Sequence, residues 1–263
     1  MLFRAKTISG YNLDSDDGEI GKVKEFYFDD NHWTIRYLVA DTGDWLSSRQ
    51  VLISPYALIS VNEELHSISI HLSRKQIEES PTLYTDKPVS RQFEQDYYGY
   101  YGWPIYWGGA NTWGYSSFIP GNSELVFPNV QPTKHSNSTG KEWDPNLRST
   151  HDVIGHDIQA LDGEIGHVAD FLIDEENWSI RYLVVDTRNW WPGKKVLISP
   201  NWIERISWDD SKVFVHLNLE AIKQAPEYTD ETEITREYEA SLHEYYDRQG
   251  YWVKEAVTKA HLL

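Results

Sequence analysis

Charged side chains recur at matching places in two parts of the 263-residue sequence, and they are the first candidates for chemistry. Arg36 and Arg181 each lie in an apolar stretch, and aspartates flank them at positions 29, 41, 174 and 186. An arginine beside carboxylates could bind an anion or orient a catalytic acid. A half-buried arginine without a partner would be costly, however, so an ion pair that holds the fold is the simpler interpretation. We therefore predict a structural role for four of these residues, which are Arg36, Asp41, Arg181 and Asp186.

The remaining polar residues give no catalytic or metal-binding signature. The sequence contains neither H-E-x-x-H nor G-x-S-x-G. His71 and His216 recur at strand ends without a second ligand nearby, and His151 and His156 are five residues apart, which suits a shared metal on a helix poorly. The absence of cysteine excludes thiol catalysis, iron–sulfur clusters and Cys-ligated zinc. We expect no metal, no cofactor and no enzymatic activity.

An aromatic segment, YYGYYGWPIYWGGANTWGY from Tyr97, is the most distinctive stretch. Its rings alternate with glycines, and the candidates for an interaction surface are Trp103, Tyr106, Trp107 and Trp113. Such rings can pack internally over a small barrel, form a protein-binding surface, or stack on a ligand such as a carbohydrate. All three interpretations remain open, with internal packing favoured.

The elements that position these residues occur twice. DGEIGKVKEFYFDDNHWTIRYLVADTGDW from Asp17 returns as DGEIGHVADFLIDEENWSIRYLVVDTRNW from Asp162, an offset of 145 residues. Between Asp17 and Pro55, 22 of 39 positions are identical to their counterparts. The chain is therefore a tandem duplication of a domain-sized unit, because the repeat is too long for a solenoid. We expect a first repeat over residues 1–99, a Gly-rich aromatic linker over 100–146, and a second repeat over 147–263.

Within a repeat, the pattern is that of short strands. KVKEFYF and WTIRYLVAD read as a hairpin, in whose second arm Trp33, Ile35, Tyr37 and Val39 would share one face. The first arm breaks its alternation, which predicts a bulge near Lys24–Glu25. Gly21 and its counterpart Gly166 suit a tight turn and a close strand approach.

Further short strands follow in VLIS, ALISV and SISIHL, so the sheet is small and strongly β. A small barrel would leave few exposed strand edges. Two short helices should follow each barrel, with N-caps at Ser73, Ser90, Asn218 and Thr235. We predict a mainly β protein with two small barrels in tandem, each followed by helical and aromatic-rich segments.

Composition limits the partners. The formal net charge is −17, from 24 Lys and Arg against 41 Asp and Glu, so nucleic acid would be repelled at long range. No apolar run approaches the ~20 residues that span a bilayer, and the first residues do not resemble a secretory signal. We expect a cytoplasmic protein that neither binds nucleic acid nor inserts into a membrane.

The repeated pattern DGEIGxV, W-x-I-R-Y-L-V-x-D-T and VLISP resembles the PRC-barrel domain family. The resemblance covers both repeats, roughly residues 1–85 and 147–229. It implies a small β-barrel used as an assembly or adaptor module, without a catalytic centre common to the family. The two copies could also pack as a pseudo-dimer within one chain. The expected function is therefore a non-catalytic adaptor that binds another protein or itself, with a small-ligand module, perhaps for a carbohydrate, as the alternative.

Overall fold

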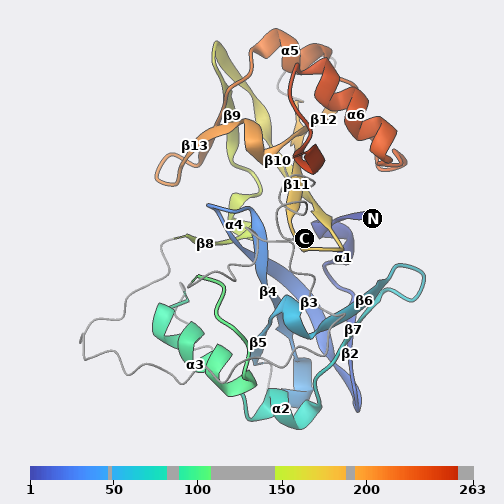
Figure 1. Ribbon diagram of the computed structural model, residues 1–263, viewed down its shortest axis with the longest axis vertical. Coiled ribbons are helices and arrows are strands. Elements are labelled where there is room, and N and C mark those ends of the chain that lie inside the picture. Colours follow the sequence, from blue (N-terminus) through green and yellow to red (C-terminus); the bar gives the residue numbers. More distant parts are fainter. Residues whose placement is uncertain (47–48, 82–88, 108–145, 188–192, 254–263) are drawn as a thin grey trace. The chain divides into compact units, whose positions relative to one another are not determined.

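The computed structural model describes residues 1–46, 49–81, 89–107, 146–187 and 193–253. They belong to two compact units, shown in Figure 1. We call Ile8–Ser149 the first-repeat unit. The other, the second-repeat unit, joins Met1–Thr7 to Thr150–Leu263. Each unit is described by itself below.

The first-repeat unit is built on a mixed sheet that, among the described residues, has seven strands. The order is β5-β4-β3-β2-β7-β6, with β8 paired to β3. The only parallel pair in this order, within the described part of the chain, joins β2 to β7. The strands are β2 (Asn12–Ser15), β3 (Gly18–Asp29), β4 (Thr34–Asp41), β5 (Gln50–Ile53), β6 (Leu58–Asn62), β7 (Ser67–Ile70) and β8 (Leu147–Ser149).

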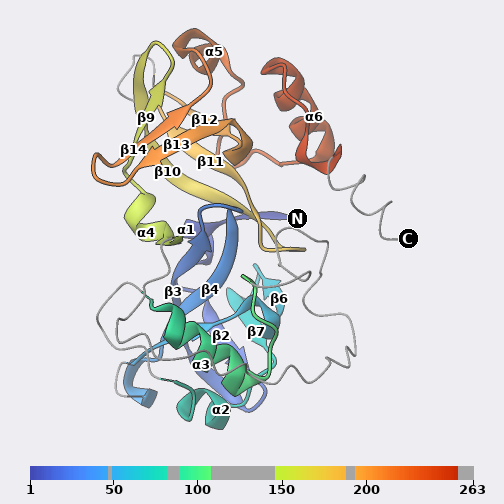
Figure 2. The ribbon, with the colours of Figure 1, turned by 60° about the vertical axis from the view of Figure 1, so that its left-hand side comes forward.

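The second-repeat unit repeats this topology in its described residues, in the order β12-β11-β10-β9-β14-β13 with β1 paired to β10. Figure 2 shows β9, β14 and β13 side by side. The strands are β1 (Leu2–Arg4), β9 (Asp157–Ala160), β10 (Gly163–Asp174), β11 (Ile180–Asp186), β12 (Lys195–Ile198), β13 (Ile203–Ser207) and β14 (Lys212–Val215). The prediction of a mainly β protein made of two similar small domains is confirmed.

Short helices complete both units. They are α1 (Ala5–Ile8), α2 (Arg74–Glu78), α3 (Arg91–Tyr101), α4 (Thr150–Val153), α5 (Leu219–Gln224) and α6 (Arg236–Tyr245), with 3-10 turns η1 (Gly43–Leu46), η2 (Pro55–Ala57) and η3 (Pro200–Trp202). The predicted caps are confirmed at Ser73, Ser90 and Thr235, whose side chains accept backbone N–H groups of the first helical turn. Asn218 occupies the predicted cap position of α5 but its side chain makes no capping bond.

The long hairpin of each unit carries the predicted irregularity. In the β3–β4 pair the register shifts between Val23 and Glu25, so the predicted bulge is confirmed. A second shift follows between Tyr27 and Phe28. Trp33, expected inside the second arm, instead lies in the turn with φ of 52°, and its counterpart Trp178 has φ of 59°. A positive φ is unfavourable for a bulky residue, and stacking of the Trp33 ring on Phe28 at 5.2 Å offsets part of that cost.

Gly21 sits where β3 passes close to the end of β4. A Cβ atom at this position would lie 2.0 Å from the backbone oxygen of Asp41, and φ is +137°. Gly166 has the same surroundings, 2.0 Å from the backbone oxygen of Asp186. The predicted close approach is thus present in both units, and only glycine fits it.

Each sheet contains one strand from the other repeat. β1 begins the first repeat in sequence but pairs with β10, placing Leu2 opposite Asp174. β8 begins the second repeat but pairs with β3, placing Leu147 opposite Asp29. Both residues of the second pair are related to those of the first by the 145-residue offset. The two repeats therefore exchange equivalent strands in the same register, which the sequence analysis did not predict.

Candidate functional site

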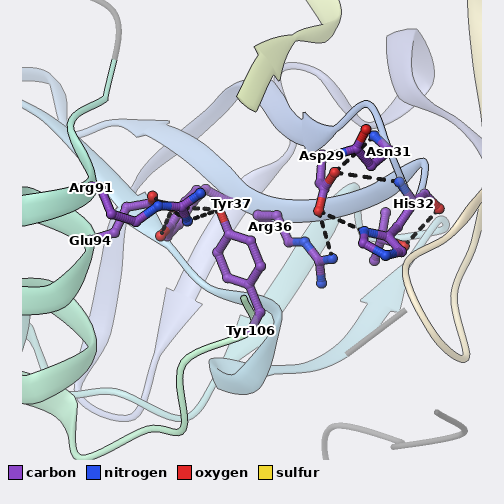
Figure 3. Close-up of polar contacts among 9 residues, drawn as sticks. Asp29, Asn31, His32, Arg36, Tyr37, Arg91, Glu94 and Tyr106 are labelled. Atoms are coloured by element: carbon purple, nitrogen blue, oxygen red, sulfur yellow. Dashed lines mark hydrogen bonds and ion pairs between the residues drawn. The ribbon is translucent and has the colours of Figure 1, made fainter. Parts of the chain in front are cut away.

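The polar residues that recur in both repeats converge in one buried group in each unit. In the first-repeat unit the group comprises Asp29, Arg36, Tyr37, Glu94 and Tyr106 (Figure 3). In the second-repeat unit it comprises Asp174, Arg181, Tyr182, Glu239 and Tyr251. We call each group a carboxylate–tyrosine cluster. Its members come from the end of the long strand, the next strand, the later helix and the segment after that helix.

The arginine of each cluster is paired and covered. Arg36 is 0 % exposed, and its Nη2 donates to Asp29 Oδ2 at 3.0 Å. The guanidinium lies 4.2 Å from the ring centroid of Tyr106. Arg181 repeats both contacts, with Asp174 Oδ2 at 2.7 Å and the ring of Tyr251 at 3.9 Å. A carboxylate on one side and an aromatic face on the other stabilise the buried charge.

The Asp29 carboxylate has further partners in the hairpin turn. It accepts the backbone N–H of Asn31 at 2.9 Å, and His32 Nδ1 lies 2.9 Å from its Oδ2. Burial alone would raise the pKa of Asp29, but the hydrogen bond from His32 and the charge of Arg36 outweigh it and lower that pKa to about 2. Asp29 is therefore ionised at neutral pH and serves as the counter-charge of Arg36.

The centre of the cluster is a fully buried glutamate on the helix. Glu94 in α3 is 0 % exposed and accepts hydrogen bonds from the hydroxyls of Tyr37 at 2.8 Å and Tyr106 at 2.6 Å. Arg91, one helical turn earlier, lies 3.0 Å from its second oxygen. Ser90 caps the start of α3 by accepting the backbone N–H of Phe93, and their three-residue spacing brings Arg91 and Glu94 together on the helix. One carboxylate oxygen thus accepts two hydrogen bonds, and the other lies beside the Arg91 guanidinium, which compensates the buried charge.

Glu239 in α6 has the same role in the second-repeat unit. It accepts from Tyr182 at 3.0 Å and from Tyr251 at 2.8 Å, and Arg236 lies 2.9 Å away. Burial and the neighbouring carboxylates raise the pKa of Tyr37 well above its ordinary value and also raise that of Tyr182. These hydroxyls remain hydrogen-bond donors at neutral pH. The clusters therefore hold the helix and the following segment on the sheet.

The four residues predicted to be structural lie in different places. Arg36 and Arg181 are cluster residues, and their partners are Asp29 and Asp174. Asp41 lies at the exposed end of β4, where its carboxylate accepts the backbone N–H of Gly43 at 3.0 Å. Asp186 is buried at the end of β11. The structure thus places the aspartate partners of the arginines at the turn before the strand.

The predicted aromatic surface is largely a packed layer in its described part. Tyr106 is 2 % exposed and belongs to the cluster. Trp103 is half-buried and stacks on Tyr101 at a centroid distance of 4.4 Å. Trp107, also half-buried, lies under the guanidinium of Arg91 at 4.3 Å. Trp113 and most of the predicted linker lie outside the described residues.

The layer differs between the units at several positions, and one of them holds a histidine in the second-repeat unit. Tyr98 in α3 is fully buried, whereas its counterpart in α6 is His243, which is 2 % exposed. His243 Nε2 lies 3.1 Å from the Tyr182 hydroxyl, and its ring contacts Trp202 and Trp252 at centroid distances of 5.1 and 5.0 Å. Burial lowers the pKa of His243, although the interaction of its ring with the backbone of Gln249 opposes this.

The two glutamates at the centre of the clusters, Glu94 and Glu239, were not among the residues predicted from the sequence. A signal was present, since the 145-residue offset continues through the tails of both repeats. It aligns Arg91 with Arg236, Glu94 with Glu239, Tyr106 with Tyr251 and Trp107 with Trp252. A charged residue preserved between two copies in an aromatic stretch marks a buried interaction, whereas Glu in a helix is otherwise an ordinary surface residue.

Fold and site together define a class of protein. It is a duplicated small β domain whose recurring polar residues bond to one another in the interior. The family model of the PRC-barrel domain matches residues 3–75 and 145–218, which is more than half of the chain. The chain belongs to the PRC-barrel domain family, and the resemblance seen in the sequence is confirmed. No curated protein matches the chain.

Within the described ranges, no three His, Asp or Glu side chains are grouped in a way that could hold a metal ion. Nor does any helix among them have the length and apolar character needed to cross a membrane.

Proposed function

We propose that this protein is a non-catalytic adaptor, which binds another protein or a further copy of itself through the surfaces of its PRC-barrel domains. The observation that carries the proposal is the use of the recurring polar residues. In both units Arg, Asp, Glu and Tyr of the carboxylate–tyrosine clusters are buried and bonded to one another. Groups held in this way stabilise a scaffold and are not available to a substrate.

The charge of the chain supports a protein partner. With a formal net charge of −17, the chain repels phosphate backbones and anionic lipid surfaces at long range. A partner with a basic surface would be attracted by the same field, and its association rate would fall as salt screens the charges.

The packing of the aromatic layer gives less support to a small-ligand module. The ring of Tyr106 is sandwiched in the cluster beside Arg36, and one face of Trp103 is covered by Tyr101. A carbohydrate platform needs open aromatic faces. Titration of the full chain with simple oligosaccharides, followed by tryptophan fluorescence, is expected to leave the emission unchanged.

The adaptor proposal is tested by association measurements on the full-length chain. Its mass is measured by light scattering over a concentration series, and proteins retained from native extract are purified and titrated against it by calorimetry. We expect saturable binding, either to itself or to a purified partner, with a dissociation constant in the micromolar range or tighter, about −8 kcal/mol or more favourable. A matched control replaces the exposed Ile59 by Ser, which alters the surface without touching a cluster. A chain that stays monomeric and binds no purified protein would contradict the proposal.

A further inference from the structure

The exchanged strand β1 is held on β10 by more than its backbone ladder. Arg4 Nε donates to Asp170 Oδ2 at 2.9 Å, and the backbone N–H of Lys6 donates to the other oxygen of Asp170 at 3.1 Å. Arg4 also lies 2.7 Å from Asp230. Phe3 is buried and meets the ring of Trp178 edge-on at 5.3 Å. Asp170 is 1 % exposed, so the strand supplies the donors that this buried carboxylate needs.

The exchanged strand β8 occupies the equivalent edge of β3. The hydroxyl of Ser149 donates to the buried carboxylate of Glu25, which is the counterpart of Asp170. Arg148 Nε donates to Asp30 Oδ2 at 3.0 Å. Both edges therefore offer the incoming strand the same chemistry, a buried acid next to the bulge and a ladder of three residue pairs.

The two edges bind equivalent strands in the same register. β1 and β8 are equivalent by the 145-residue offset, and each docks on a repeat to which it does not belong in sequence. The same contacts can form between two chains, because exchange of an identical element preserves every native contact. What favours the arrangement within one chain is the effective concentration of the tethered strand.

We propose that a second copy of this chain is a partner of the β10 edge, to which it supplies its own β1 in place of the resident strand. This proposal rests on the proposed function and specifies the case in which the chain binds a further copy of itself. α1 joins β1 to the first-repeat unit, so such an exchange links the first-repeat unit of one molecule to the second-repeat unit of another. Only the contacts of Met1–Thr7 with the second-repeat unit are broken and reformed, and the association rises with protein concentration.

The natural absence of cysteine allows a direct test. Phe3 and Ile173 are opposite one another in the β1–β10 register, and both are buried. Directly opposite residues on antiparallel strands have Cβ atoms about 4.5–5.5 Å apart, close to disulfide geometry. Full-length chains carrying only Phe3→Cys are mixed with full-length chains carrying only Ile173→Cys, and then gently oxidised. A covalent dimer between the two variants forms only where β1 of one chain lies on β10 of another.

Three controls make the result interpretable. The double variant F3C/I173C must close within one chain, which shows that the pair can bond. Phe3→Cys mixed with Ile59→Cys, at an exposed position, reports random collision. The pair Arg4→Cys and Leu172→Cys, the next in the register, repeats the test in case loss of the Phe3 ring prevents folding.

We expect the mixed dimer to exceed the collision control by about ten-fold or more, since a docked pair has a far higher effective concentration than two free thiols. Its yield should increase with protein concentration. Closure within the double variant without any mixed dimer would overturn the exchange. Self-association or partner binding that persists without the mixed dimer would also overturn it, while leaving the adaptor proposal intact.

Discussion

The two units keep the same carboxylate–tyrosine cluster but surround it differently. Asp, Arg, Tyr and Glu are identical in both, whereas Tyr98 of the first-repeat unit is replaced by His243 in the second. At the exchanged strands, an ion pair between Arg4 and Asp170 corresponds to a hydrogen bond between Ser149 and Glu25. The cluster is therefore common to both units, whereas the residues that surround it differ.

The largest effect is expected from the centre of the cluster. Glu94→Ala removes the acceptor of two buried tyrosine hydroxyls and the partner of Arg91, so the first-repeat unit should lose about 3–5 kcal/mol of unfolding free energy. Glu239→Ala should have the same effect on the second-repeat unit. Urea unfolding with hydrogen exchange to assign each transition measures both. Glu94→Gln, which keeps an acceptor, should cost less. A loss below about 1 kcal/mol in both alanine variants would show that the clusters do not hold the helices on the sheets.

A smaller but still large effect is expected at the crossing glycine. Gly21→Ala places a methyl group against the backbone oxygen of Asp41 at a positive φ, and should destabilise the first-repeat unit by about 2–4 kcal/mol. Gly10→Ala is the matched control, since Gly10 also has a positive φ but no atom within 4 Å of an added Cβ. It should cost only about 1 kcal/mol. Equal losses at the two glycines in urea unfolding would contradict the close approach of the strands.

An intermediate loss of stability is expected in the unit built mainly from the repeat that does not carry the substitution. Arg4→Ala removes a charged donor from the buried carboxylate of Asp170 and should destabilise the second-repeat unit by about 2 kcal/mol. Ser149→Ala should destabilise the first-repeat unit by about 1 kcal/mol, because it removes one hydrogen bond to Glu25. Thermal unfolding monitored separately for the two units checks the direction. If Arg4→Ala instead destabilised the first-repeat unit, or Ser149→Ala the second-repeat unit, the strand exchange would be contradicted.

The smallest effect concerns pH and depends on one of the differences between the aromatic layers, Tyr98 against His243. Burial lowers the pKa of His243 in the folded chain below its ordinary value near 6.5. The unfolded chain therefore binds the proton more readily, so the stability that neutral His243 allows is present above pH 6.5 and is lost as pH falls toward the folded pKa. His243→Tyr restores the residue of the first-repeat unit and should weaken this dependence.

His156 sets the background for that measurement. Its pKa is also lowered by burial, and it lies in the same unit, so it contributes acid sensitivity with the same sign. Urea midpoints between pH 7.5 and 5 for the second-repeat unit should therefore fall less steeply in the His243→Tyr variant without becoming flat. An unchanged slope would show that the histidine does not distinguish the units.

Local rules and repetition made much of the fold predictable. The duplication, the hairpin with its bulge, three of the helix caps and the close approach at Gly21 were all evident from short-range patterns. The family followed from the repeated motifs. Each of these features depends on residues near one another in sequence or on a comparison of the copies.

The site was less predictable because its contacts span long distances along the chain. Tyr37 and Glu94 are 57 residues apart, and nothing in the local pattern of a helical glutamate indicates a buried acceptor. The strand exchange was hidden for another reason. Since β3 and β10 present equivalent edges, pattern and register alone cannot tell which repeat supplies the docking strand. Trp33 was misplaced because a positive φ is unusual for so large a residue.

The reciprocal exchange of strands is the central claim, and hydrogen exchange of the full chain with the Arg4→Ala substitution tests it most directly. The account predicts faster exchange in β10, over residues 163–174, with β3 unchanged, and the opposite pattern for Ser149→Ala. Faster exchange in β3 on substitution of Arg4, with β10 unchanged, would contradict the exchange and return each strand to its own repeat.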